Sequence, residues 1–274
     1  MNACVQLPGG ALINGEIQRF AWFRPITGKV ELLITSPANQ YLGRPAWVSA
    51  VLAAAIEKIG AIEMSVVIAD RLTVGDRIFL MLQLGIRYTG DQMWLTPACE
   101  SCGEQFDVSV KRSELPVQKA SNDYPSALVN INRREVSLRA INGKDQQWLN
   151  ENPSAEIVQT LLNRCVQTAD GKQPVSEFIN GLDRKDCDYL ESAIQKIGPD
   201  VDCTLLVRCP ECSVVQEVEI DPYWLGQTQR SNLDNEVHTL AFYYHWSEAE
   251  ILNLTRERRH TFLNLIDKER ACHA

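Results

Sequence analysis

Two short stretches, Cys99-Glu100-Ser101-Cys102 and Cys209-Pro210-Glu211-Cys212, decide how this chain of 274 residues is organised. They begin 110 positions apart, and each supplies two thiol side chains spaced three residues apart. Structural zinc takes four ligands in a tetrahedron, so neither stretch completes such a site alone. Together they predict one structural Zn²⁺ site with four cysteine ligands, which are Cys99, Cys102, Cys209 and Cys212.

The sequence that precedes each stretch repeats at the same spacing. Thr73 corresponds to Asp183, and both residue types are typical helix N-caps. An acidic residue follows each of them three positions later, where it favours the exposed N–H groups of a helix start. Each predicted helix then ends at a helix breaker, Gly90 in the first copy and Pro199 in the second. One type of helix is therefore expected twice.

Strand patterns flank each Cys-x-x-Cys stretch. Short apolar runs precede the cysteines at Met93–Leu95 and Thr204–Val207, and alternating patterns follow them at Phe106–Val110 and Gln216–Ile220. Each half is therefore predicted to carry helices and a β-hairpin with a metal knuckle at its tip. A shared order of cap, helix, breaker, strand and knuckle favours duplication over chance, and two copies of so long a unit indicate a duplicated domain.

These patterns predict an α+β fold with a pseudo-twofold tandem duplication. The first repeat is expected at residues 1–120, the second at 121–229, and a helical docking segment at 230–274. Zinc ribbons usually space their knuckles about 15–20 residues apart. A pseudo-twofold axis between the repeats would bring these more distant knuckles together. Binding of the ion within one chain, or between two chains of a dimer, remains open at this point.

Composition narrows the class of protein. The net charge of -8 and the isoelectric point near 5.1 disfavour a nucleic-acid partner, because phosphate binding depends on clustered Lys and Arg. No apolar run approaches the roughly 20 residues that span a bilayer, and residues 1–10 do not resemble a signal peptide. We expect a location in the cytoplasm, or in a particle assembled there. The odd number of nine cysteines, without a secretion signal, favours metal binding over disulfides.

No pattern indicates an enzyme. Four cysteines fill a zinc tetrahedron and leave no position for a substrate, so the predicted ion is purely structural. A dithiol redox site is the rival interpretation, but such motifs lie at a helix N-terminus, whereas these lie between two strands. The four histidines, at positions 238, 245, 260 and 273, match no standard catalytic or metal-binding motif.

The segment from residue 230 onward has no counterpart in the first repeat. A helix is expected at Asn235–Tyr244, a second after the capping box Ser247–Glu250, and a third after Thr255. Five basic and five acidic residues lie between Trp246 and the chain end, so this helical segment has no basic excess for DNA. We interpret it as a protein-docking surface centred on Trp246, Arg256, Arg258 and Arg259.

Four stretches together carry a family resemblance: Leu7-Pro8-Gly9-Gly10, Phe23-Arg24-Pro25-Ile26-Thr27-Gly28, Val74-Gly75-Asp76-Arg77 and His245-Trp246-Ser247-Glu248-Ala249-Glu250-Ile251-Leu252. With them, the chain resembles the baseplate proteins of contractile phage tails and related injection systems, a group that includes the T4-type baseplate hub subunit. The resemblance implies a non-enzymatic component that contacts spike, hub, tube or wedge proteins. A tail-assembly chaperone and a zinc-ribbon nucleic-acid-binding regulator are the alternatives.

Overall fold

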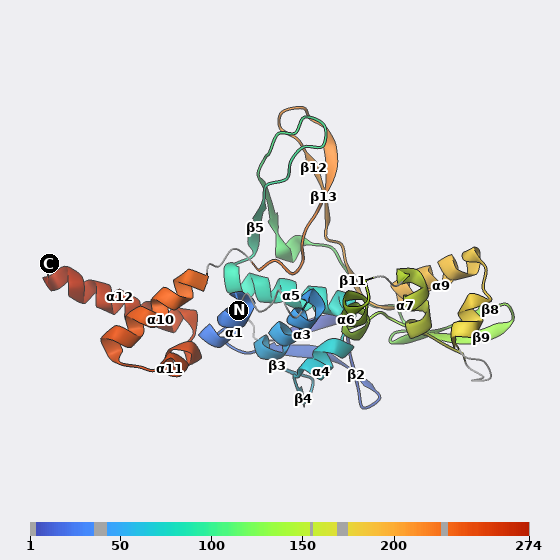
Figure 1. The fold of residues 1–274 in the computed structure, drawn as a ribbon, viewed down its shortest axis with the longest axis horizontal. Helices are drawn as coiled ribbons and strands as arrows, with labels where there is room; N and C mark the ends of the chain where they lie inside the picture. The colour runs from blue at the N-terminus through green and yellow to red at the C-terminus, as the bar shows by residue number, and fades with distance from the viewer. Residues whose placement is uncertain (1–3, 36–42, 154–155, 169–174, 226–229, 274) are drawn as a thin grey trace.

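The computed structural model describes residues 4–35, 43–153, 156–168, 175–225 and 230–273. Three bodies lie in a row, and a narrow stalk of β-strands rises from the middle of the molecule (Figure 1). We call residues 4–91 the first unit, residues 126–201 the second unit, and residues 230–273 the C-terminal segment. The stalk comprises residues 92–111 and 204–219, which continue from the first and second units respectively.

The first unit is built on an antiparallel sheet in the order β1-β2-β3-β4. The β1–β2 hairpin turns at Asn14 and Gly15, which both have positive φ, as a tight hairpin turn requires. Helices α3 and α5 pack against this sheet and bury Leu52, Leu84 and other apolar side chains completely. The elements are β1 (Cys4–Ile13), β2 (Glu16–Phe23), α1 (Gly28–Thr35), α3 (Arg44–Ala55), β3 (Ile56–Ile59), β4 (Ile62–Glu63), α4 (Val66–Arg71) and α5 (Val74–Thr89).

The second unit has a smaller antiparallel sheet in the order β10-β9-β8. Val136 and Leu138 on the central strand and Leu162 and Leu190 on the helices are buried in a core separate from that of the first unit. The elements are β8 (Ser126–Ile131), β9 (Arg134–Arg139), α6 (Gly143–Glu151), α7 (Ile157–Cys165), β10 (Val166–Thr168), α8 (Val175–Asn180) and α9 (Arg184–Ile197).

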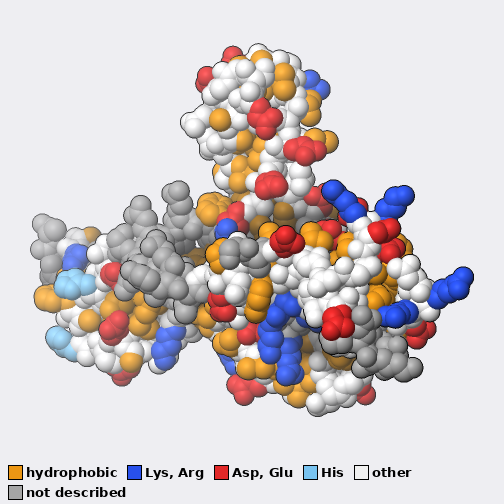
Figure 2. All heavy atoms as spheres, turned by 45° about the vertical axis from the view of Figure 1, so that its right-hand side comes forward, with side chains coloured by type: hydrophobic (Ala, Val, Ile, Leu, Met, Phe, Trp, Pro, Cys, Tyr) orange, Lys and Arg blue, Asp and Glu red, His pale blue; other side chains and the backbone are white. Residues whose placement is uncertain are grey.

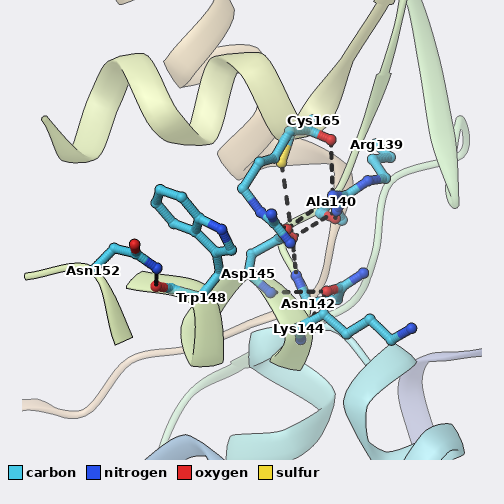
Figure 3. A network of polar contacts seen from close by, with 9 residues as sticks. Arg139, Ala140, Asn142, Lys144, Asp145, Trp148, Asn152 and Cys165 are labelled. Carbon is cyan, nitrogen blue, oxygen red and sulfur yellow. Dashed lines mark hydrogen bonds and ion pairs between the residues drawn. The ribbon is translucent and has the colours of Figure 1, made fainter. Parts of the chain in front are cut away.

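A buried carboxylate ties the second unit together (Figure 3). Asp145 on α6 is fully buried and accepts two hydrogen bonds from Arg139, at 2.7 and 2.9 Å, and one from Arg164 at 2.7 Å. It also accepts the N–H of Asn142 at 3.0 Å, which completes the capping box at the start of α6. Burial alone would raise the pKa of Asp145, but the paired Arg139 outweighs it and the pKa is lowered.

Apart from β4, which occurs only in the first unit, the described elements of the two units follow the same order: a hairpin, two helices, a strand that returns to the hairpin, and two more helices. Thr73 and Asp183 cap α5 and α9, each accepting the N–H three residues later. Helix α5 ends at Thr89 before Gly90, and α9 ends before Gly198. The predicted caps and breakers are thus found where the sequence indicated them, within a mixed α/β fold with small sheets.

The contact between the two units is one-sided. The N–H of Val74, at the start of α5, donates to Ile141 O at 3.1 Å, and the N–H of Gly143 donates to Leu72 O at 3.1 Å. In the first unit the position that corresponds to Gly143 is Gly28, which contacts the C-terminal segment instead of the second unit. A twofold axis would make these contacts reciprocal. The pseudo-twofold axis expected from the sequence therefore does not relate the bodies of the two units.

The stalk consists of two antiparallel hairpins, one from each unit (Figure 1). Strand β5 (Gln92–Leu95) pairs with β6 (Val108–Lys111), and β12 (Thr204–Arg208) pairs with β13 (Val215–Glu219). Both hairpins enclose a Cys-x-x-Cys stretch, as the strand patterns predict. At the base, the chain leaves the first hairpin through the short helix η1 (Arg112–Glu114). Strand β7 (Val117–Gln118) follows and pairs with β11 (Asp200–Val201) of the second unit.

The C-terminal segment is helical, as expected. It contains α10 (Arg230–Tyr244), α11 (Glu248–Asn253) and α12 (Arg256–His273), and α10 begins five residues earlier than the sequence predicted. Ser247 and Glu250 form the predicted capping box of α11. Leu240, Ile251 and Ile266 form a core of the segment's own. In the described part of the chain, no helix has the length and apolar character needed to cross a membrane.

Candidate metal centre

The two Cys-x-x-Cys loops at the tip of the stalk have the same backbone conformation and hydrogen bonds. In the first, the N–H of Cys99 donates to Glu104 O at 2.8 Å and the N–H of Gly103 donates to Cys99 O at 2.9 Å. In the second, the N–H of Cys209 donates to Val214 O at 2.9 Å and the N–H of Ser213 donates to Cys209 O at 3.0 Å. Both loops turn through a left-handed residue directly after the second cysteine, with φ of 75° at Gly103 and 61° at Ser213.

These loops bring all four predicted ligands together. Cys99 Sγ lies 3.5 Å from Cys212 Sγ, and Cys102 Sγ lies 3.8 Å from Cys209 Sγ. All four sulfurs lie within 4.8 Å of one another, in a single chain. A tetrahedron with Zn–S bonds of about 2.3 Å has edges of roughly 3.8 Å. The donor atoms and their spacing therefore fit a Zn²⁺ ion held by four thiolates.

The sulfur cluster is half covered by the protein. Cys99 and Cys209 are buried, whereas Cys102 and Cys212 face solvent. Phe106 and Val207 pack beside the buried pair and form a small apolar core that belongs to the stalk. The first cysteine of each stretch therefore packs in the interior of the stalk, and the second lies on the solvent side of the cluster.

The protonation of the two thiols in the first loop shows why a cation suits the cluster. The N–H groups of Cys102 and Ser101 lower the pKa of Cys99 to about 6. The N–H of Glu104 also lowers the pKa of Cys102, but burial and the hydrogen bonds of the three neighbouring sulfurs outweigh it and raise that pKa to about 12. The loops thus favour one thiolate but oppose several together. A bound divalent cation removes that conflict, because a coordinating thiol is deprotonated by the metal.

Gln216 joins the two hairpins beside the sulfurs, and sequence reasoning did not find it. Its side chain is buried, its Nε2 donates to Ala98 O at 3.0 Å, and its Oε1 accepts the N–H of Glu100 at 2.9 Å. The first hairpin has Phe106 at the corresponding position, so the repeat offers no signal for a bridging amide there. Only the inward direction of Gln216 in an alternating strand pointed to a buried polar side chain.

The four residues predicted to dock a partner lie in different environments. Trp246 is half-buried and stacks on Tyr244 with ring centroids 4.8 Å apart. Arg258 is exposed above the ring of Phe262, and Arg256 lines a cavity of about 590 Å³ between the first unit and the C-terminal segment.

Arg259 differs from the other three. Its side chain is completely buried and binds both carboxylate oxygens of Glu31 at 2.9 Å and one oxygen of Glu236 at 2.7 Å. Burial would lower its pKa, but the two acidic partners outweigh that effect and raise it. The exposed docking role expected for Arg259 is therefore replaced by an internal one: it joins the C-terminal segment to the first unit.

The structure thus has two mixed α/β units whose hairpins meet in a stalk, with four cysteine sulfurs gathered at its tip. Residues 23–223 match the family model of the T4 bacteriophage base plate protein, and the chain belongs to this family. The match covers the first unit from the end of β2 onward, the whole second unit and both Cys-x-x-Cys loops, and it ends before the C-terminal segment. The family resemblance found in the sequence is thereby confirmed. No curated protein and no solved structure matches the chain.

Proposed function

We propose that this chain is a structural component of the baseplate of a contractile tail or injection particle, made in the cytoplasm and assembled there. It docks to spike or hub, tube or wedge proteins. Membership of the baseplate family carries the proposal and points to a non-enzymatic role. The shape supports it: three bodies in a row with a projecting stalk offer several separate surfaces to neighbours (Figure 1).

The proposed zinc ion clasps the two hairpins of the stalk within one chain. The observation that carries this proposal is the convergence of Cys99, Cys102, Cys209 and Cys212 from two loops more than a hundred residues apart. Four thiolates leave no coordination position for a substrate, so the ion stabilises the stalk and takes no part in a reaction.

We also propose that the chain arose by duplication, with repeats at residues 1–120 and 121–229 and the docking segment at 230–274. The shared order of elements, the matched caps of α5 and α9 and the identical hydrogen bonding of the two Cys-x-x-Cys loops support this division. A partner would meet the C-terminal segment at Trp246, Arg256 and Arg258, which remain accessible at least in part.

The surface of the stalk disfavours the nucleic-acid alternative. Exposed acidic side chains surround both loops, and Figure 2 shows them along the stalk. They are Glu100, Glu104, Asp107, Glu211, Glu217 and Glu219. A zinc ribbon that binds nucleic acid needs a basic face to meet the phosphates. A gel-shift titration tests this alternative: tight binding that weakens steeply with salt would favour a regulator.

Metal analysis tests the clasp. Protein purified under reducing conditions is expected to contain about one zinc per chain, as one four-ligand site requires. The Cys187→Ser variant, which changes a cysteine outside the cluster, should keep that zinc. A metal-free protein that forms a reversible disulfide would instead support dithiol redox chemistry.

Particle composition tests the baseplate role. The chain should be found at fixed stoichiometry in purified tails or injection particles. Its presence only in assembly intermediates, and its absence from the finished particle, would favour a tail-assembly chaperone.

A further inference from the structure

The C-terminal segment repeats a helix pair of the first unit. Residues 247–259 correspond to residues 65–77 at a constant spacing of 182 positions, and in both places a six-residue helix is followed by a longer one. Helices α11 and α12 thus correspond to α4 and α5. The matching residues are the N-cap Ser65 with Ser247, Leu72 with Leu254, Thr73 with Thr255, and Arg77 with Arg259.

Both helix pairs dock on the same kind of site. We call this site the glycine corner: residues 26–28 in the first unit and residues 141–143 in the second, each between a strand and a helix. Thr73 forms a β-bridge with Asn142, and Thr255 forms one with Thr27. The glycine N–H donates to a leucine carbonyl at 3.1 Å in both cases, from Gly143 to Leu72 and from Gly28 to Leu254.

The glycine at each corner leaves room for the same close approach. A Cβ on Gly143 would lie 2.5 Å from Arg77 Nη1 and 3.1 Å from the Cα of Asp70. A Cβ on Gly28 would lie 3.1 Å from Arg259 Nη1 and 3.0 Å from the Cα of Leu252, the residue that corresponds to Asp70. The two interfaces therefore use the same backbone contact between a helix pair and a corner.

The same interface forms whether the helix pair comes before or after its glycine corner in the chain. The α4–α5 pair precedes the corner on which it docks, whereas the α11–α12 pair follows its corner, with the whole second unit in between. The C-terminal segment also has a core of its own. Among the described residues, one ionic contact holds it to the first unit, the buried pair of Arg259 and Glu31. Arg77, by contrast, bonds within its own unit, to Ser49 and to backbone carbonyls.

We propose that the glycine corner of the first unit also accepts the C-terminal segment of a second copy of this chain, so that two copies exchange residues 230–273 reciprocally. Exchange of an identical element needs no new contact and is a low-cost route to a dimer. The covalent connection favours the internal arrangement at low concentration, and high local concentration in a particle favours exchange. This proposal concerns a surface separate from the sulfur cluster and does not rest on bound zinc.

Two charge-reversal variants test the exchange. Glu31→Arg and Arg259→Glu each place like charges at the contact and should release the segment, which limited proteolysis detects. Mixing the two variants restores an opposite-charge pair only between chains. We expect native mass spectrometry to show a heterodimer with twice the mass in the mixture, and single chains in each variant alone. The double variant in one chain should regain protease resistance in part, because Glu236 in the same segment then lies beside a second acidic side chain. Lys268→Glu, at an exposed position of α12, should behave as wild type throughout.

A mixture that remains monomeric while the double variant is protected would overturn the proposal, because docking would then occur only within a chain. The wild-type protein gives a second test that does not depend on the folding of any single variant. Concentrated mixtures of unlabelled and isotope-labelled wild-type chains should form mixed dimers. Monomers alone over the whole concentration range would equally refute the exchange.

Discussion

The two similar halves of the chain contact each other differently in the stalk and in the units below it. At the tip of the stalk the contact is reciprocal, since Cys99 faces Cys212 while Cys102 faces Cys209. Between the units it is one-sided, because the first unit docks on the glycine corner of the second and receives the C-terminal segment in return. A four-ligand metal site takes two thiolates from each loop, so the contact between the loops is symmetric. Docking of a helix pair on a glycine corner is a head-to-tail contact, in which each unit contributes a different surface.

The two regions also differ in what stabilises them. Each unit has a large apolar core, whereas the stalk buries only a few apolar side chains around its sulfurs. A two-stranded hairpin alone is marginally stable in water, so the stalk depends on the contact between its loops. The units depend on burial and on a few buried charges. Variants in the stalk should therefore change metal content and local amide exchange, whereas variants in the units should change the free energy of unfolding.

The largest effect is expected at the sulfur cluster. Cys99→Ser removes one of four ligands, and structural zinc can supply on the order of 10 kcal/mol of apparent binding free energy that is coupled to folding. We expect loss of zinc and loss of amide-exchange protection in both hairpins, because the ligands come from both. Zinc content and hydrogen exchange measure the two effects.

Cys187→Ser is the matched control for that variant, since Cys187 lies on α9 outside the cluster. Protection should then be unchanged in the stalk. If Cys99→Ser kept its metal, or lost protection in the first hairpin alone, the reciprocal clasp would be wrong.

A smaller loss is expected in the second unit. Asp145→Asn leaves Arg139 and Arg164 without their shared carboxylate, and removal of one partner from a buried pair costs about 3–5 kcal/mol. Both arginines are about one-third exposed, so solvent screening places the expected loss near the lower limit, about 3 kcal/mol. Urea unfolding measures it. Glu151→Gln, at the exposed end of the same helix, is the control and should change stability by less than about 0.5 kcal/mol.

Part of this organisation could be predicted from the sequence. Local signals identified the Cys-x-x-Cys loops, the caps at Thr73 and Asp183 and the breakers after each helix, because these depend on neighbouring residues. The direction of docking depends on contacts between distant segments, which no local pattern records. Arg259 shows the difference: within a charged run it is typical of a solvated face, and only Glu31, far away in the sequence, explains its burial.

The proposed duplication stays a prediction from the sequence. The spacing of 110 residues predicts two related halves, but it gives no sign of the second spacing, which relates α4–α5 to α11–α12. Its signal is faint, because a serine cap, a leucine, a threonine and an arginine are shared over a short stretch. Their common role becomes visible when both helix pairs are seen on a glycine corner.

Stability in the body of the first unit should depend on pH through Asp76. Its carboxylate is buried and accepts the N–H groups of Gly9 and Gly10 and the hydroxyl of Thr73. Burial outweighs these bonds and raises the pKa from 3.8 to about 6. The folded state therefore binds the proton more tightly than the unfolded chain. Stability from this group is fully present below pH 3.8 and is lost as the pH rises through 6, by about 3 kcal/mol.

Asp76→Asn should remove that pH dependence, so the variant gains stability relative to wild type between pH 4.5 and 7.5. Urea unfolding at both values gives the comparison, with Asp186→Asn on α9 as the control at the corresponding helix position. A difference between Asp76→Asn and wild type that does not change with pH would contradict the buried-carboxylate explanation.

The smallest effect returns to the stalk, at Gln216, whose contacts between the hairpins have no counterpart from Phe106. Gln216→Ala leaves the carbonyl of Ala98 and the N–H of Glu100 without their partner, and each buried unsatisfied group costs about 1–3 kcal/mol. Water can reach the tip of the stalk, so we expect a loss of about 1 kcal/mol, seen as faster amide exchange in β5 and β6 with zinc retained. Gln105→Ala, at an exposed side chain in the loop of the first hairpin, is the control. Equal exchange in both variants would mean that the sulfurs alone hold the hairpins together.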